Sequence, residues 1–278
     1  MSDMRTPGSS PFYAVAGFIV DEEGEGACAC SSTPHEWLDE LAAAGSPAAA
    51  LGFADMALAS SVATIAAGRV PATTSLQIDF VAPVPTGPLT CSSRVTDQHD
   101  GVVLAEGSMA AEGMPVGRVT LRSMLITARP VDAPVRASAP PDSAVGVGSA
   151  AMTGILGGGL ATACGARLVA GDERSLTMTL VPVAELGRSH GVMHGGAIAA
   201  IGALGIAATR ERLLTPGARW RHLDARVDFL REIPMARTLE VRASARHLGR
   251  RLALFEAELI AADGRLAATA RETVVIQV

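Results

Sequence analysis

The sequence repeats itself across its midpoint, and this repeat limits the folds that are open to the chain. ATTSLQIDFVAPVPTG in the first half aligns with WRHLDARVDFLREIPMA in the second, which pairs Ile78 with Val227 at a separation of 149 residues. Further upstream, Gly17 pairs with Gly165 at a separation of 148 residues. One inserted residue reconciles the two separations, so the repeat predicts a duplication that gives two similar domains.

The boundary between the two domains is predicted by composition. A chain of 278 residues is long for one compact domain and comfortable for two. Residues 130–150 are rich in Pro, Ala, Ser and Gly and have no helical or strand period, which is typical of a linker. We therefore expect an N-terminal domain at 11–129, a linker at 130–150 and a C-terminal domain at 151–278.

Both halves show the same order of elements, which is a hairpin, a long helix and then further strands. The expected hairpins are 17–20 with 27–31 and 166–170 with 175–181, the helices 47–67 and 195–214, and the later strand pairs 102–111 with 116–128 and 251–261 with 266–278. Each helix is apolar around most of its circumference, so we expect it to be enclosed. The turns Glu112-Gly113 and Asp263-Gly264 are hairpin signals at matching places. The pattern predicts an antiparallel sheet wrapped around one helix in each half.

Such a half resembles the hotdog fold, and one segment makes the resemblance sharper. Residues 190–199, HGVMHGGAIA, resemble the G-x-x-H-G-G segment that opens the central helix of hotdog acyl-CoA thioesterases of the PaaI-like type. The resemblance implies the α+β class and a tandem double hotdog. From the repeat and the strand that follows each helix, we also expect the two sheets to join edge to edge.

The two halves lack complementary parts of the family's active site. In the family, an acid usually follows the motif histidine on the same helix and acts on the thioester as general base or nucleophile. The matching position, nine residues after His194, holds Ala203. The first half has Asp55, but nine residues before it stands Ser46, with proline and alanine in place of the glycines. Because paired hotdog domains combine the glycine end of one helix with the acid of the other, the resemblance implies one complete site and one degenerate site.

The complete site is expected to contain Asp55, His194, Gly195 and Gly196. A helix N-terminus carries unpaired N–H groups and partial positive charge, so the Gly195 N–H would polarise the thioester carbonyl. Gly196 would lie beside the substrate, and we expect His194 to position the loop rather than to carry protons. The alternative for Asp55 is a structural role as a cap or a solvent-facing residue.

Three further residues are candidates from the family pattern. Thr73 stands eighteen positions after Asp55, where related thioesterases often carry a hydroxyl that orients water, and the next two residues are alternatives. Arg188 stands where the family often has Asn, with His190 nearby, so we expect both to contact the substrate. His190 and His194 have the spacing of a helical metal pair, but no third ligand is evident and no metal or other cofactor is predicted.

The chain has no lysine, so contacts with the coenzyme A phosphates must come from Arg, His or backbone N–H groups. Arg250 and Arg251 open a strand after Gly249 and are candidates for this contact. The second candidate cluster consists of Arg210, Arg212, Arg219 and Arg221. A solvated surface explains either group equally well.

Composition excludes several other classes of partner. A net charge of −5 and a pI of about 5.7 provide no basic field for nucleic acid or an acidic membrane surface. The four cysteines show neither the density of a disulfide scaffold nor a paired metal pattern, and Cys91 has no supporting pattern as a nucleophile. No apolar run suits a signal peptide or a membrane span, so we expect a cytoplasmic protein.

These observations predict an acyl-CoA thioesterase with one composite site per chain. The non-enzyme alternative is an acyl-CoA-binding or regulatory protein in which both sites have decayed. A hotdog hydratase or dehydratase would need a different Asp/His arrangement. Because the fused pair already supplies the basic hotdog dimer, we expect any homo-oligomer to form between whole chains.

Overall fold

The computed structural model describes residues 10–127, 153–188, 191–214 and 218–277. The expected linker at 130–150 lies outside the described residues, so the domain boundaries stay predictions.

The elements follow the same order in both halves. The first half contains α1 (Pro11–Ala16), β1 (Phe18–Gly24), β2 (Ala27–Ser32), α2 (Glu36–Ala43), α3 (Ala48–Ala63), β3 (Val70–Phe80), β4 (Leu89–His99), β5 (Val102–Ala111) and β6 (Met114–Ile126). The second half contains α4 (Thr153–Leu156), α5 (Gly159–Ala163), β7 (Arg167–Gly171), β8 (Ser175–Leu180), the 3-10 helix η2 (Ala184–Leu186), α6 (Gly195–Leu213), β9 (Arg219–Phe229), β10 (Leu239–Leu248), β11 (Leu252–Ile260) and β12 (Leu266–Gln277).

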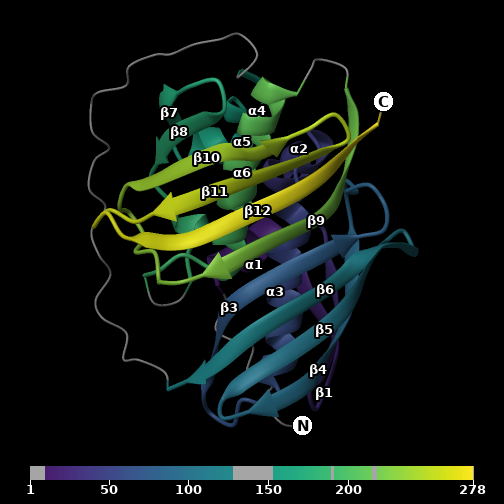
Figure 1. Cartoon of the computed structure of the whole chain (residues 1–278). Coiled ribbons are helices and arrows are strands. Elements are labelled where there is room, and N and C mark those ends of the chain that lie inside the picture. The colour runs from purple at the N-terminus through teal and green to yellow at the C-terminus, as the bar shows by residue number, and fades with distance from the viewer. Residues whose placement is uncertain (1–9, 128–152, 189–190, 215–217, 278) are drawn as a thin grey trace.

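All the strands join into one antiparallel sheet (Figure 1). Its order is β1-β2-β4-β5-β6-β3-β9-β12-β11-β10-β8-β7, which reads as two copies of one half-sheet joined at β3 and β9. Ser75 lies opposite Asp228 and Asp79 opposite Asp224 across this junction. The predicted edge-to-edge junction is confirmed.

The register at the junction agrees with the sequence repeat. Gln77 lies opposite Arg226, and these two residues are also equivalent in the repeat because 149 positions separate them. An equivalent pair can lie opposite each other only on an axis that exchanges the halves. A pseudo-twofold axis therefore passes between β3 and β9 at Gln77 and Arg226.

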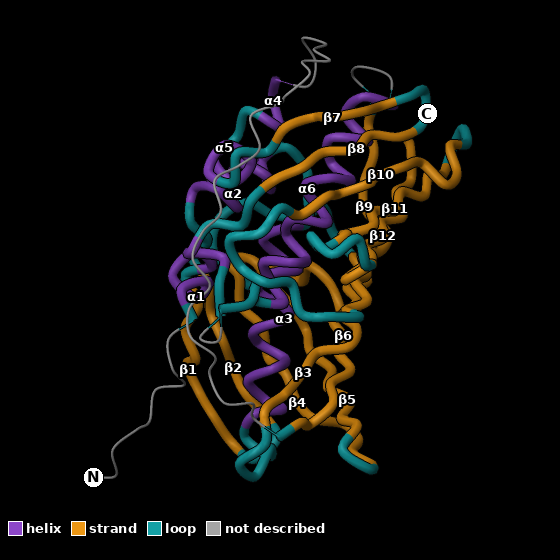
Figure 2. Tube along the Cα trace, turned by 90° about the vertical axis from the view of Figure 1, so that its left-hand side faces the viewer, coloured by secondary structure: helices purple, strands orange, loops and turns teal. Residues whose placement is uncertain are grey.

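The curved sheet encloses α3 and α6, which pack against each other (Figure 2). A Cβ atom on Gly196 would lie 2.8 Å from Gly52 O, so the absence of side chains at these positions lets the two backbones approach closely. Nearly every residue of α6 is buried, as the apolar circumference predicted. Helix α3 ends at Ala63 rather than at 67, and Ala67 and Gly68 adopt positive φ angles in the turn that follows.

The tight turns explain a second small difference from the sequence expectation. Glu112 and Gly113 both have positive φ, at 49° and 77°, as a two-residue hairpin turn requires. Strand β6 therefore begins directly after the turn, at Met114, and not at 116. Within the part of the chain that the structure describes, no helix is long and apolar enough to cross a membrane.

Candidate active site

The structure brings the acid of the first half against the glycine motif of the second. Asp55 lies on α3, is only 3% exposed, and has its carboxylate at the N-terminus of α6. A Cβ atom on Gly195 would lie 2.6 Å from Asp55 Oδ2, so the carboxylate occupies the space that any side chain at this position would need. The glycine is therefore required by the approach of the acid.

Thr73 reaches Asp55 because of an irregularity in β3. The pairing of β3 with β6 shifts register between Thr73 and Ser75, which leaves Thr74 as an extra residue. Such a bulge changes the alternation of side chains along a strand and re-aims the residue next to it. Thr73 Oγ1 donates a hydrogen bond of 2.9 Å to Asp55 Oδ1, while the hydroxyl of Thr74 donates to the backbone oxygen of Arg122 at 3.1 Å. Of the three hydroxyl candidates, the structure places Thr73 on the acid.

The buried position of Asp55 sets its protonation. Burial raises the pKa of Asp55 from 3.8 to about 6, against the hydrogen bond from Thr73, the charge of Arg188 and the N–H of Gly196, which all lower it. A carboxyl with this pKa is ionised near neutrality and still a usable proton acceptor. Asp55 is therefore suited to act as a base.

His194 caps the helix as a neutral side chain. Its Nδ1 accepts a hydrogen bond of 3.0 Å from the Gly196 N–H and lies 3.5 Å from Asp55 Oδ2. Burial, together with the charge of Arg188, lowers the pKa of His194 from 6.5 to about 3. Because Nδ1 is an acceptor, the ring proton is assigned to Nε2. This arrangement fits the expected positioning role better than proton transfer.

A network of backbone contacts holds the loop before α6. The His194 N–H donates to Leu186 O at 3.0 Å, and the Met193 N–H donates to Ile233 O at 2.8 Å. Arg188 donates through its own N–H to Val192 O at 2.7 Å, which closes the loop on itself. Arg188 thus lies at the start of the loop that leads to α6. His190 lies outside the described residues.

One donor at the helix start is available to a ligand. The Gly196 N–H is shared between His194 and Asp55. Within the described ranges, no hydrogen-bond acceptor is found for the Gly195 N–H. This donor and the Asp55 carboxylate lie together at the boundary between the halves.

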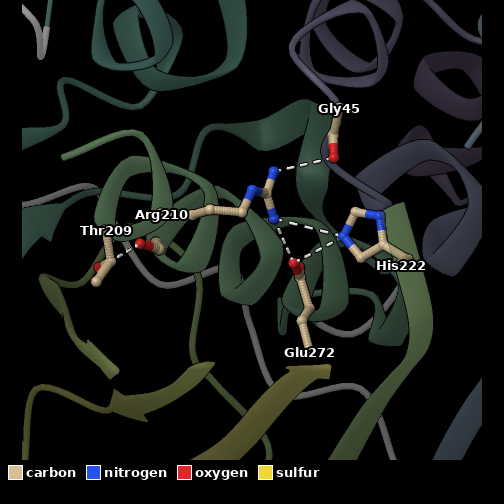
Figure 3. A network of polar contacts seen from close by, with 6 residues as sticks. Gly45, Thr209, Arg210, His222 and Glu272 are labelled. Carbon is tan, nitrogen blue, oxygen red and sulfur yellow. Dashed lines mark hydrogen bonds and ion pairs between the residues drawn. The ribbon is translucent and has the colours of Figure 1, made fainter. Parts of the chain in front are cut away.

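The pseudo-twofold axis generates a degenerate counterpart of this site, and a charged network lies there (Figure 3). The counterpart of Thr73 is His222, and Gly45 directly precedes Ser46, the counterpart of His194. Arg210 Nη1 donates to Glu272 Oε2 at 2.6 Å, and Arg210 Nη2 donates to Gly45 O at 2.9 Å. His222 Nε2 lies 3.0 Å from the same Glu272 oxygen. The three side chains of this network are buried and come from the second half, and the first half contributes the backbone oxygen of Gly45.

The arginine candidates for contact with the coenzyme A phosphates lie away from Asp55. Arg250 and Arg251 are exposed in the turn between β10 and β11, where the Ile276 N–H donates to Arg251 O. Ile276 pairs with Trp220, so this turn lies at the end of β9 that carries the degenerate counterpart. In the second cluster, Arg210 is 2% exposed and paired with a carboxylate, which removes it as a candidate for surface phosphates.

Two aromatic residues that the sequence reading missed lie against His194. Phe12 stacks on the His194 ring, and Tyr13 meets it edge-on. Burial and the charge of Asp55 raise the pKa of Tyr13, while Arg188 lowers it. The sequence signal that could have revealed them is their place before Gly17, because the second half has the aliphatic residues Leu160 and Ala161 at the equivalent positions.

Metal ligation finds no support in the described residues, where no group of three or more His, Cys, Asp or Glu side chains is placed to hold an ion. The four cysteines are free and buried. Burial raises the pKa of Cys91 to about 12, which makes this thiol a poor nucleophile.

A model of the thioesterase superfamily matches the sequence at residues 47–113 and 190–268, segments that include Asp55 and the glycine motif. No curated protein matches the chain. The tesB protein of Mycobacterium avium subs paratuberculosis has a similar structure, with a TM-score of 0.65 at 15% identity, over 97% of this chain and all of that one.

Two further solved structures are similar over nearly the whole chain. Acyl-CoA thioesterase II TesB2 from Mycobacterium marinum gives a TM-score of 0.63 at 13% identity, over 96% of each chain. A protein of unknown function with a hot dog fold from Alicyclobacillus acidocaldarius gives a TM-score of 0.56 at 12% identity, over 97% of this chain and 99% of that one. At these identities the similarity shows the fold, and the expected double hotdog is confirmed.

Proposed function

The chain belongs to the thioesterase superfamily, and from this premise we propose that it hydrolyses an acyl-CoA thioester at one composite site per chain. The observation that carries the proposal is the contact between the Asp55 carboxylate of one half and the Gly195 helix start of the other. The two parts that thioester hydrolysis needs, a base and an oxyanion donor, meet there. A resemblance to the PaaI-like type in particular remains an expectation.

In the proposed reaction, the thioester carbonyl oxygen accepts a hydrogen bond from the Gly195 N–H. The developing negative charge on this oxygen is then stabilised by the donor and by the partial positive charge of the helix end. A well-placed donor of this kind contributes roughly 3 kcal/mol to the transition state. This stabilisation acts on the reacting carbonyl group and not on the rest of the substrate.

Asp55 acts on the opposite side of the carbonyl, in one of two ways. As a base, it takes a proton from water while the water oxygen bonds to the carbonyl carbon; the carbon–sulfur bond then breaks, and the leaving thiolate takes up the proton from Asp55. As a nucleophile, its oxygen attacks the carbonyl carbon and the carbon–sulfur bond breaks, which gives an anhydride and the CoA thiolate; water then hydrolyses the anhydride and supplies the proton for the thiolate. The free acid and the CoA thiol are the products in both cases. Thr73 donates a hydrogen bond to Asp55 Oδ1, and the other carboxylate oxygen, Oδ2, faces the start of α6.

The test is the release of free CoA thiol from a panel of acyl-CoAs. We expect Asp55→Asn to abolish most turnover and to leave acyl-CoA binding largely intact, because asparagine keeps the size but has no basic oxygen. Asp97→Asn, on the exposed face of β4, is the matched control and should keep wild-type turnover. Wild-type turnover by the Asp55 variant would contradict the proposal. Binding without hydrolysis by the wild-type chain would favour the acyl-CoA-binding alternative.

A further inference from the structure

Phe12 fills a notch that two glycines create where α3 and α6 meet. Its side chain is fully buried. A Cβ atom on Gly196 would lie 2.7 Å from Phe12 Cε1, and a Cβ atom on Gly52 would lie 3.2 Å from Phe12 Cζ. A side chain at Gly196 would thus collide with the ring, and one at Gly52 would crowd it.

The same ring forms one wall for His194. The Phe12 and His194 rings are stacked, with centroids 5.2 Å apart and an angle of 25° between their planes. Tyr13 meets His194 edge-on, with centroids 5.6 Å apart and an interplanar angle of 70°. The imidazole is therefore confined while its Nδ1 accepts from the Gly196 N–H.

Helix α1, which carries both aromatic residues, is anchored at both ends. Before the helix, Ser10 Oγ donates to Gly187 O at 2.7 Å, a contact between the two halves. After the helix, Gly17 has a φ of 56°, and a Cβ atom there would lie 1.8 Å from Thr33 O. The N–H of His35 also donates to Val15 O at 2.8 Å. Because of these contacts, the Phe12 ring cannot slide out of the notch.

The degenerate counterpart lacks the whole arrangement. At a separation of 148 residues, Phe12 corresponds to Leu160, and Tyr13 corresponds to Ala161. The two glycines of the notch, Gly52 and Gly196, correspond to Ala200 and Ala48, and His194 corresponds to Ser46. Leu160 is 1% exposed, so an ordinary aliphatic residue suffices to fill the core there. Of the two places, the one that has the histidine also has the aromatic ring and the two glycines, and its counterpart has none of them.

We propose that Phe12 is a positioning residue of the active site, which fixes the His194 ring and, through it, the N-terminus of α6 opposite Asp55. The inference rests on the proposed thioester hydrolysis for its effect on turnover. Its effect on His194 can be measured without any substrate. Removal of the ring would free the imidazole to turn, so that Nδ1 no longer accepts from Gly196 and water reaches the buried carboxylate.

The test compares Phe12→Leu with Leu160→Ala. Phe12→Leu installs the residue of the degenerate counterpart, and Leu160→Ala truncates the equivalent core position away from the site. We expect Phe12→Leu to lower kcat by about 10- to 100-fold with a smaller effect on KM, because the reacting groups lose their alignment. Leu160→Ala should lower Tm but keep kcat.

The second measurement is NMR of the His194 ring nitrogens as a function of pH, assigned by comparison with His194→Gln. In the wild type we expect a neutral ring, protonated at Nε2, because burial and the charge of Arg188 lower the pKa to about 3. The charged or titratable groups near the ring are Asp55, Arg188 and Tyr13. In Phe12→Leu the pKa should move up toward 6.5 and the preference for one tautomer should weaken, whereas Leu160→Ala should leave both unchanged.

The outcomes separate the two proposals. If Phe12→Leu lowers Tm but leaves both kcat and the His194 signals as in Leu160→Ala, Phe12 is a core residue only and the inference is wrong. If the wild type hydrolyses no acyl-CoA, the proposed function fails, while the His194 signals still decide whether Phe12 positions the ring. Phe12→Met, which also lacks the ring and has about the volume of leucine in a more adaptable side chain, gives the same comparison should Phe12→Leu fail to fold.

Discussion

At the residue scale, the site depends on a carboxylate that faces a residue without a side chain. Asp55 is buried, and its partners only partly offset the cost of its charge, so its pKa rises to about 6. His194 is also buried, but its pKa falls to about 3, which keeps it neutral. Asp55 is therefore the group that titrates near pH 6, whereas His194 stays neutral and keeps its hydrogen bond.

The pH dependence of turnover follows from these two values. The proposed reaction needs ionised Asp55, so kcat/KM should rise with pH, by about tenfold per unit below the pKa, and level off above about 6. His194 should add no second step between about pH 5 and 8. The measurement is kcat/KM for one acyl-CoA across this range. A rate that falls as pH increases through 6 would contradict the role of Asp55 as base.

Replacement of the first motif glycine tests the contact directly. In Gly195→Ala, the new methyl group would lie 2.6 Å from the present position of Asp55 Oδ2, so the carboxylate has to move away from the helix start. We expect a loss of turnover on the order of 100-fold, as for other small misplacements of reacting groups. Gly24→Ala is the control, because its Cβ would have no heavy atom closer than 4.0 Å. Equal turnover in the two variants would show that the close contact does not matter.

At the scale of elements, α6 contacts the first half at two places, one near each end of the helix. One is the contact of Asp55 with Gly195, and the other is the hydrogen bond from Arg210 to Gly45 O. Arg210 also lies over the Trp220 ring, at 4.0 Å from its centroid. The second place has buried charged side chains instead of an acid that faces a glycine. We expect these side chains to stabilise the contact between the two halves.

The first half shows which apolar residues could replace the charged pair. Arg210 corresponds to Val62 at a separation of 148, and Glu272, which pairs with Ala225, corresponds to Leu121, which pairs with Leu76. Val62 and Leu121 are both buried. The double variant Arg210→Val, Glu272→Leu therefore copies a core that already exists in the same chain.

We expect each single variant to lose about 3–5 kcal/mol of unfolding free energy, because it leaves one buried charge without its partner. The double variant should lose clearly less than the sum of the two, since it leaves neither charge. Denaturant unfolding of the four proteins measures this coupling. Strictly additive losses would mean that the pair does not stabilise the chain as a unit.

At the scale of the whole molecule, one chain combines two copies of a fold into one site. Thr73 and His222 lie four residues before Gln77 and Arg226, the pair on the pseudo-twofold axis, on antiparallel strands. At about 3.3 Å per residue, the active site and its degenerate counterpart lie roughly 26 Å apart along the centre of the sheet. Only one of the two places has both an acid and a helix start with glycines.

The stoichiometry of binding tests this asymmetry. Calorimetric titration with a non-hydrolysable acyl-CoA thioether should give one site per chain, because the counterpart is filled by Arg210, Glu272 and His222. Ala203→Asp restores an acid there, yet turnover should not increase, because the Ser46-Pro47-Ala48 segment still lacks the glycines. Two equivalents of bound analogue per chain would contradict the single-site interpretation.

The sequence by itself determined the duplication, the order of elements, the edge-to-edge sheet and the distribution of site parts between the halves. These features are encoded locally, in apolar periods, in turns such as Glu112-Gly113 and in a repeat whose register carries over to the pairing of Gln77 with Arg226. Asp55 and the glycine motif could be found because each half lacked what the other kept.

The tertiary structure alone decided which side chains complete and surround the site. The family pattern had offered Thr73 with two alternatives, and a bulge places Thr73 on Asp55. Phe12 reaches Gly196 across 184 positions, and Arg210 meets Gly45 across 165. No local pattern marks such contacts, because they depend on how closely two helices approach and on which volume remains between them. The packing of α1, α3 and α6 against one another settles these distances, and a linear sequence does not express them.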